Sequence, residues 1–426
     1  MRESFDVAIV GGGPGGSVCA SRLAQRGVRT LVLEKERFPR FHLGESLLPG
    51  SMPVLEAIGV LPKALDTFIH KYGARFHDDV RGRKDRFGFD GAWSPKHEHA
   101  FEVPRDLFDK VLLDHAASLG ADVREEWTVT GAVRDEHGRV IGVLADAPDG
   151  THVTIDAKYV VDASGRDALF AHASRSTEKI VDLDQTALFT HYENVARPTG
   201  KLAGDIDIVI FRESAESRPN WFWMIPFKDG RTSVGAVVSR RWIKEHREKI
   251  GAGANETLLL GAAIAESKTA VELLAGSTNL WPEARAAADF SYRVRDLSGP
   301  GWIAVGDAGG FIDPLFSTGA HLAMCGGKEA ADMLVELLAA SDARSREEAD
   351  IAKWAAWLRL GAETFILAVQ AFYAGPLMES IFAENKHAAL RRSITSLLAG
   401  DVFTDAVWLR DTRLRLKEML AQPRLI

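Results

Sequence analysis

The sequence of 426 residues has little cysteine and no long apolar run. Only Cys19 and Cys325 are present, without Cys-x-x-Cys spacing, which argues against a disulfide framework or a cysteine metal site and fits a reducing cytoplasm. The longest late apolar stretch, Thr364–Met378, is too short to span a bilayer as a helix. The N-terminus has no basic segment followed by a long apolar one. We therefore expect neither a membrane span nor secretion.

An excess of positive charge is also missing. The chain has 52 Lys and Arg against 59 Asp and Glu, a formal net charge of −7, and its basic residues are scattered among acids. A protein that follows a phosphate backbone needs a basic stripe, so we expect no nucleic-acid partner. We also expect no metal site. With 46% hydrophobic residues, a chain of this length predicts two or three interlocked subdomains rather than one simple core.

The first 34 residues have the pattern of a βαβ unit. Asp6–Val10 and Thr30–Leu33 read as buried parallel strands, and Ser17–Gln25 reads as the helix between them. The intervening turn, Gly11-Gly-Gly13-Pro14-Gly-Gly16, carries the Gly-x-Gly-x-x-Gly spacing that lets a pyrophosphate approach backbone amides at a helix N-terminus. Glu34 then ends the second strand, at the spacing at which an acid reaches a ribose hydroxyl. We predict a dinucleotide site that includes Pro14 and Lys35.

Further elements predict how the rest of the chain is organised. The expected strands are Val140–Leu144, Val153–Ile155, Tyr159–Asp162, Ile206–Phe211, Trp221–Phe227, Ser233–Val238 and Trp302–Val305, and the expected helices are Leu107–Leu119, 317–340 and most of 346–413. Together they predict an α/β fold: a Rossmann-type dinucleotide-binding domain, an inserted antiparallel β-sheet substrate domain and a C-terminal helical region with a break at Gly375-Pro376. The expected boundaries are 1–75, 95–180 and 285–345 for the first, 76–94 and 181–284 for the second, and 346–426 for the third.

Two short segments indicate that the dinucleotide is FAD. Val161-Asp162-Ala-Ser-Gly-Arg166 and Gly306-Asp307-Ala308 resemble the glutathione-reductase-like flavoprotein monooxygenases. The resemblance implies that Asp162, Gly306 and Asp307 bind the cofactor and that Arg105, in Val103-Pro104-Arg105, lies along it. Only one dinucleotide fingerprint is present, so a separate NAD(P)H flavin reductase is expected to supply FAD in its reduced form.

Three more segments resemble the flavin-dependent halogenases. The first, Trp221-Phe-Trp223-Met-Ile-Pro226, matches their Trp-x-Trp-x-Ile-Pro signature. In a strand, Trp221 and Trp223 point to the same face, which is also how an ordinary aromatic core pair would lie. The resemblance implies an active-site wall, with Pro226 and Phe316, that separates flavin from substrate.

The second segment, Phe311-Ile-Asp-Pro314-Leu-Phe-Ser317-Thr318-Gly319, fits the family pattern Phe-x-x-Pro-x-x-Ser-x-Gly. It leads into the long predicted helix, whose free amides and dipole favour an anion. The resemblance implies that backbone at Pro314, Ser317, Thr318 and Gly319 contacts both halide and flavin. Tryptophan halogenases carry a catalytic Glu where this chain has Phe316, so tryptophan is a poor candidate substrate.

The third segment, Gly44-Glu-Ser46-Leu-Leu-Pro49, precedes Lys71, which matches the active-site lysine of the family. The resemblance implies that reduced FAD, oxygen and chloride or bromide give a C4a-hydroperoxide and then hypohalous acid. A lysine beside the substrate can hydrogen-bond that oxidant or hold it as a haloamine, and lowering the lysine pKa by burial would help the second role. We also expect Ser46 to be one of the residues that bind the cofactor.

The substrate is expected to be an electron-rich pyrrole or phenol. Gly400-Asp-Val-Phe403 looks like the tail of halogenases that act on pyrroles tethered to a carrier protein, while a free phenol is an equal alternative. The aromatic helical stretch Trp354–Tyr373 could line the substrate pocket or simply fill a core. Three other functions remain open: a flavin-dependent aromatic hydroxylase, a geranylgeranyl-reductase-like enzyme and a non-catalytic flavoprotein.

Overall fold

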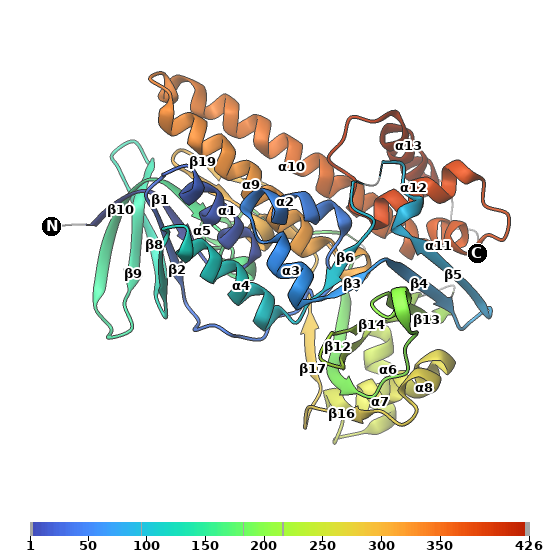
Figure 1. Ribbon diagram of the computed structural model, residues 1–426. Helices are drawn as coiled ribbons and strands as arrows, with labels where there is room; N and C mark the ends of the chain where they lie inside the picture. The colour runs from blue at the N-terminus through green and yellow to red at the C-terminus, as the bar shows by residue number, and fades with distance from the viewer. Residues whose placement is uncertain (1–2, 95, 182, 215–216, 422–426) are drawn as a thin grey trace.

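The computed structural model describes residues 3–94, 96–181, 183–214 and 217–421. Two large sheets lie side by side, and a group of helices from the second half of the chain packs over both (Figure 1). The helices are α1 (Pro14–Gln25), α2 (Met52–Ile58), α3 (Leu61–Thr67), α4 (Arg105–Ser118), α5 (Leu169–Ser174), α6 (Arg240–Ile250), α7 (Glu256–Glu266), α8 (Lys268–Leu274), α9 (Thr318–Ala339), α10 (Ala343–Tyr373), α11 (Pro376–Phe382), α12 (Ala388–Leu398) and α13 (Val407–Ala421).

The first sheet contains the predicted βαβ unit. Its order is β19 (Ser298–Gly299), β20 (Trp302–Ala304), β10 (His152–Asp162), β1 (Glu3–Val10), β2 (Thr30–Glu34) and β7 (Asp122–Glu125), with β9 (Val140–Asp146) and β8 (Thr128–Arg134) attached beside β10. Strands β20, β10, β1, β2 and β7 pair in parallel. Helix α1 begins at Pro14 rather than Ser17, since proline is well suited to a first helical position.

One strand assignment was wrong. Val153–Ile155 and Tyr159–Asp162 are a single strand, β10. Its first half pairs antiparallel with β9 and its second half pairs in parallel with β1. Between the two expected strands, Asp156 and Lys158 flank the buried Ala157, so the alternation of an extended strand continues through them.

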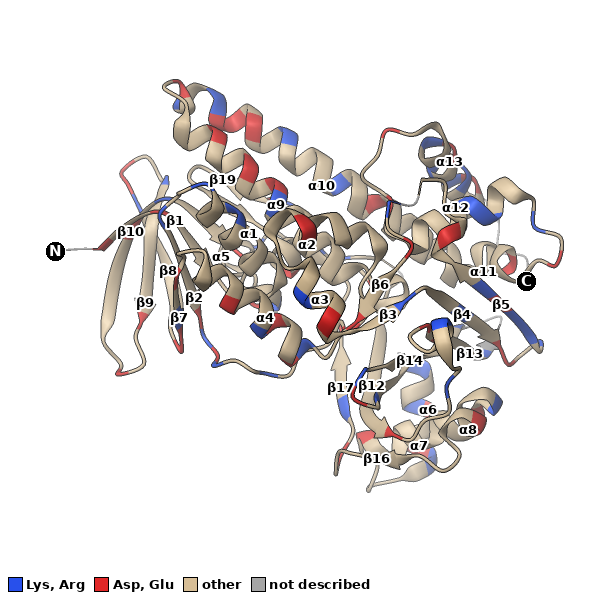
Figure 2. Cartoon of the chain, viewed as in Figure 1, with Lys and Arg blue, Asp and Glu red and all other residues tan. Residues whose placement is uncertain are grey.

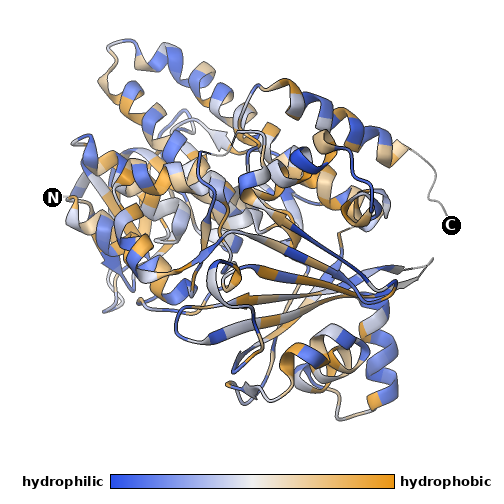
Figure 3. Cartoon of the chain, turned by 45° about the vertical axis from the view of Figure 1, so that its right-hand side comes forward, coloured by the Kyte–Doolittle hydropathy of each residue, from blue (hydrophilic) through white to orange (hydrophobic). Residues whose placement is uncertain are grey.

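The second sheet is mainly antiparallel. Its order is β16 (Thr278–Asn279), β12 (Gln185–Glu193), β15 (Arg231–Ser239), β14 (Ser217–Pro226), β13 (Ile206–Ser214), β4 (Gly73–Asp78) and β5 (Arg83–Gly88), and β17 (Arg285–Ala288) also pairs with β12. Hydrophobic residues recur along its strands, where the helices pack (Figure 3). The expected boundaries of the second domain were 76–94 and 181–284, whereas this sheet begins at Gly73 and includes Arg285–Ala288. The division into three domains remains a prediction.

Two small sheets contain the remaining strands of the described residues. They are β3 (Ile69–Lys71) with β6 (Ala100–Glu102), and β11 (Thr177–Lys179) with β18 (Tyr292–Val294) and β21 (Gly310–Phe311). The C-terminal helices break at Gly375-Pro376, as the sequence suggested, and α10 and α11 meet at 81°. Within the described residues, no single helix is both long and apolar enough to cross a membrane. Only this bent pair of helices, taken together, has that length and composition. Both acidic and basic residues occur along α10 (Figure 2).

Candidate active site

A cavity of about 510 Å³ opens where the carboxyl ends of β1 and β2 meet the second sheet. It lies where an open parallel sheet usually binds its ligand. Fourteen of the twenty predicted site residues line it: Gly11, Gly13, Pro14, Glu34, Lys35, Ser46, Arg105, Trp223, Gly306, Asp307, Pro314, Ser317, Thr318 and Gly319. The other six lie behind this lining: Gly16, Lys71, Asp162, Trp221, Pro226 and Phe316.

The glycine turn has the shape of an anion cradle. A Cβ on Gly11 would lie 2.3 Å from the Ala163 oxygen, and one on Gly16 would lie 2.0 Å from the Gly11 oxygen, so both positions require glycine. Gly13 is different, since its Cβ would meet only Arg40 Nη2, at 3.8 Å, and the space there opens into the cavity. The amides at the start of α1 therefore have room for a diphosphate.

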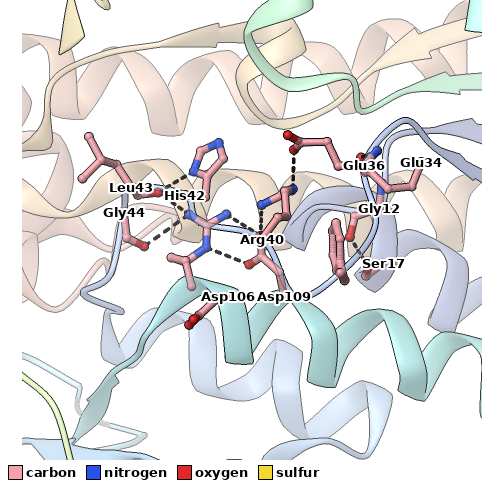
Figure 4. Close-up of polar contacts among 12 residues, drawn as sticks. Gly12, Ser17, Glu34, Glu36, Arg40, His42, Leu43, Gly44, Asp106 and Asp109 are labelled. Carbon is pink, nitrogen blue, oxygen red and sulfur yellow. Dashed lines mark hydrogen bonds and ion pairs between the residues drawn. The ribbon is translucent and has the colours of Figure 1, made fainter. Parts of the chain in front are cut away.

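Glu34 holds this turn as well as bordering the cavity. Its Oε2 accepts a hydrogen bond of 2.7 Å from the Gly12 amide, and its Oε1 accepts one of 2.9 Å from the Glu36 amide (Figure 4). Its neighbour Lys35 pairs with Asp167 at the cavity rim. Glu34 is thus fixed at the end of β2, where a ribose would lie beside the diphosphate.

Arg105 is held in place by a buried carboxylate that the sequence reasoning missed. Its Nε and Nη2 donate to the two oxygens of Asp109 at 2.7 and 2.9 Å, and Nη1 donates to the Leu43 carbonyl at 2.6 Å. Arg40 Nη1 reaches the same Asp109 at 3.0 Å. Burial raises the pKa of Asp109, but Arg105 outweighs it and holds that pKa below its usual value. The four-residue spacing of Arg105 and Asp109 on one helix could have indicated this ion pair from the sequence.

The two predicted cofactor acids have different surroundings. Both oxygens of Asp162 accept bonds from the protein: Oδ1 from the Ser164 amide and hydroxyl, at 3.1 and 2.5 Å, and Oδ2 from the Phe170 amide at 2.9 Å. Asp162 therefore shapes the turn that borders the cavity instead of facing it. Asp307 does face the cavity, and burial raises its pKa to about 6, an effect that Arg105 partly offsets.

The 311–319 loop borders the cavity opposite the glycine turn. Pro314–Phe316 forms a 3-10 turn, and α9 starts directly afterwards. Ser317 has the left-handed backbone angles φ 56° and ψ 35°, which are uncommon outside glycine and are kept only where the surroundings enforce them. A Cβ on Gly319 would lie 3.0 Å from Phe311 Cε2, so glycine permits this close approach. The first-turn amides of a 22-residue helix thus meet the cavity, as an anion site needs.

The aromatic wall is only partly exposed to the cavity. Trp223 lines it, with its ring over Gly235 and its Nε1 donating to Ser233 Oγ at 3.1 Å. Trp221 lies on the same strand face but deeper, and its Nε1 donates to the Tyr373 hydroxyl at 2.9 Å. Phe316 is buried against Phe372, their ring centroids 6.2 Å apart. Pro226 ends β14 and is also buried.

Lys71 lies one layer behind the cavity. It is 2% exposed, and its Nζ donates to Ser46 Oγ at 2.7 Å and to the Leu47 carbonyl at 3.2 Å. Glu102, on the paired strand β6, places Oε1 3.9 Å from Nζ and is fully buried. Burial lowers the pKa of Lys71, against the opposing effect of Glu102, and burial raises the pKa of Glu102 to about 8. Because Ser46 lines the cavity, it joins the lysine to it.

The suggestion that Trp354–Tyr373 lines the pocket is not supported. Among the described residues, those that line the cavity include none from this stretch, and most of its large side chains belong to hydrophobic cores. The 400–403 tail covers the same helix: the Phe403 ring occupies the space beside Gly361 and stacks on Trp357, with ring centroids 4.1 Å apart. These helices fill a core because their aromatic faces meet the sheets and α9.

Comparison with known proteins identifies the family. A family model described as FAD binding domain matches residues 4–247. A 1H-pyrrole-2-carbonyl-peptidyl-carrier-protein chlorinase of Pseudomonas fluorescens is 30% identical, covering 94% of this chain and 90% of that protein. The corresponding brominase of Pseudoalteromonas luteoviolacea is 28% identical, with 97% and 96% covered. The solved structure of the flavin-dependent brominase Bmp2 matches with a TM-score of 0.84 at 25% identity, covering 97% of this chain and 98% of that one.

The chain belongs to the flavin-dependent halogenases. The halogenase is accordingly an oxidoreductase that uses FAD and a halide. Of the functions left open by the sequence, the relatives support halogenation rather than the hydroxylase or the reductase. The cavity fits FAD: it combines the open glycine cradle, the amides of α1 and the fixed Glu34. Among the described residues, no group of three or more His, Cys, Asp or Glu is arranged to hold a metal ion.

Proposed function

We propose that this halogenase acts on an electron-rich pyrrole carried as an acyl group on a peptidyl carrier protein, and that Lys71 directs the halogen to the ring. The observation that carries the proposal is the environment of Lys71, a nearly inaccessible amine that donates a hydrogen bond to the cavity-lining Ser46. Support for the substrate comes from two relatives whose names specify pyrrole-2-carbonyl on a carrier protein and which match almost the whole chain.

The protein's own groups have separate tasks in this proposal. The glycine turn, Glu34 and Arg105 hold the cofactor, and the amides at Ser317–Gly319 hold chloride or bromide by hydrogen bonds and the helix dipole. When bound, reduced FAD supplies, with oxygen, the oxidation that turns halide into hypohalous acid. Trp223 keeps the substrate ring away from the flavin side of the cavity. We also propose that a separate reductase supplies the reduced flavin, since the sequence has one dinucleotide fingerprint, and that the reaction is cytoplasmic.

Lys71 can capture the oxidant because burial lowers its pKa and makes its nitrogen lone pair available. The neutral amine attacks the halogen of hypohalous acid, so that an N–halogen bond forms, the O–halogen bond breaks, and hydroxide takes the displaced amine proton as water. The substrate ring then takes the halogen and releases a proton, which returns the amine. A lysine that keeps its proton would instead hydrogen-bond the hypohalous acid and orient it.

The test combines purified halogenase with FAD, a flavin reductase, NADH and either halide, and follows pyrrolyl-carrier protein and free phenols by mass spectrometry. We expect halogenated pyrrolyl-carrier protein. Halogenation of the phenol alone would move the substrate class, and hydroxylation without halide dependence would refute the function.

Lys71→Met tests the role of the lysine. We expect it to keep FAD binding and flavin reoxidation and to release free hypohalite, trapped with monochlorodimedone, while pyrrole halogenation is lost. Lys328→Met, which removes a lysine paired on the outer part of α9, is the matched control and should behave like the parent. Retained regiospecific halogenation by Lys71→Met would remove Lys71 from the mechanism.

A further inference from the structure

Three buried polar side chains from distant parts of the chain form a hydrogen-bonded row. Trp221 Nε1 donates to the Tyr373 hydroxyl at 2.9 Å, and that hydroxyl donates to Asp313 Oδ2 at 3.1 Å. Their exposures are 1%, 6% and 0%. An indole N–H can only donate, so the tyrosine oxygen must accept from it and is left with its own proton for the carboxylate. The row therefore has one direction and one geometry.

The row joins three parts of the halogenase that the mechanism uses separately. Trp221 belongs to β14, Tyr373 is the last residue of α10, and Asp313 lies within the 311–319 loop. The second oxygen of Asp313 accepts the Leu315 amide at 2.9 Å and so fixes the 3-10 turn of the loop. The residue before Tyr373 adds an apolar contact, since Phe372 packs against Phe316. The end of α10 thus contacts the loop through two adjacent residues, Phe372 and Tyr373.

These contacts matter because the backbone of the loop is strained at Ser317. Ser317 holds left-handed angles that a non-glycine residue keeps only when its surroundings over-determine them. Asp313 and Phe316, which both contact α10, constrain the loop just before Ser317. If that constraint is released, Ser317 can relax, and the amides of Thr318 and Gly319 turn away from their position at the cavity.

We propose that Tyr373 is a positioning residue for halide: by holding Asp313, it keeps the Ser317–Gly319 amides in the conformation that binds the anion. This rests on the proposed assignment of the halide to that loop. Tyr373 touches neither the cavity nor, in this proposal, the reacting atoms. Its effect should therefore appear in the binding of halide and not in the chemical steps that follow.

The experiment compares Tyr373→Phe with Ser233→Ala. Both variants remove the hydroxyl partner of a buried indole N–H, that of Trp221 in the first and that of Trp223 in the second, but only the first disconnects the loop. We expect Tyr373→Phe to raise the KM for bromide or chloride about tenfold, the size of one lost buried hydrogen bond, with kcat at saturating halide within about twofold of the parent. Ser233→Ala should leave the halide KM unchanged while lowering the thermal unfolding midpoint similarly.

A binding measurement separates this from a loss of turnover. Titration of the FAD-loaded, oxidised protein with bromide, followed by flavin absorbance, should show the same weakening in Tyr373→Phe and none in Ser233→Ala. An unchanged halide affinity in Tyr373→Phe, or equal weakening in both variants, would overturn the inference. If the turnover of the parent protein itself shows no halide dependence, the proposed function fails instead.

Discussion

Removing Lys71 and removing Glu102 should make the stability of the halogenase depend on pH in opposite directions. The two groups lie 3.9 Å apart and are 2% and 0% exposed. We expect a buried pair this close to hold one proton in all, and the unfolded chain also holds one between the pKa of a free Glu, near ~4.3, and that of a free Lys, near ~10.4. The intact pair therefore contributes no slope to the free energy of unfolding in this range.

Lys71→Met changes that balance. Glu102 already has a pKa of about 8 with Lys71 lowering it, so in the variant it keeps its proton in the folded state through neutral pH, whereas the unfolded glutamate is ionised. The unfolded state then binds one proton fewer, and the free energy of unfolding should fall with rising pH by ~1.4 kcal/mol per unit. Over the two units from pH 5.5 to 7.5 the expected loss is about 2.7 kcal/mol.

Glu102→Gln should show the reverse. Burial lowers the pKa of Lys71 and the favourable charge of Glu102 is gone, so the folded state loses the lysine proton that the unfolded state keeps until pH ~10.4. Stability should therefore rise with pH above the folded pKa of Lys71. The double variant has neither group and should be as flat as the parent. Urea unfolding at pH 5.5, 6.5 and 7.5, expressed as variant minus parent, measures these slopes. A Lys71→Met curve parallel to the parent would refute the reasoning.

Three further substitutions test the cavity. Gly16→Ala would place a Cβ 2.0 Å from the Gly11 oxygen, so we expect loss of FAD binding, measured by flavin content after purification. Gly235→Ala would place a Cβ 2.1 Å from Trp223 Cζ2, and this overpacking should cost about 1–3 kcal/mol in urea unfolding; an unchanged midpoint would mean that the ring can move aside. Arg105→Gln leaves a buried carboxylate without its bidentate partner, and we expect at least about tenfold weaker FAD binding by fluorescence titration.

Local sequence patterns were enough for much of the fold. The apolar run before Gly11, the glycine spacing and Glu34 predicted β1, α1 and β2 because a turn and its flanking elements are set by neighbouring residues. The family pattern at Phe311–Gly319 and at Trp221–Pro226 led to the same family that the relatives establish. The local patterns divided β10 into two strands, although polar residues on an exposed strand face do not interrupt a strand.

What the sequence by itself determined, then, is the nucleotide-binding unit, the alternation of strands and helices, and the family. The tertiary structure alone decided which side chains meet: Glu102 beside Lys71, Asp109 beneath Arg105, and the row from Trp221 through Tyr373 to Asp313. The two bonds of that row join residues 152 and 60 positions apart. No periodicity or turn chemistry records such a pairing, because it arises from how sheets and helices pack once each has formed.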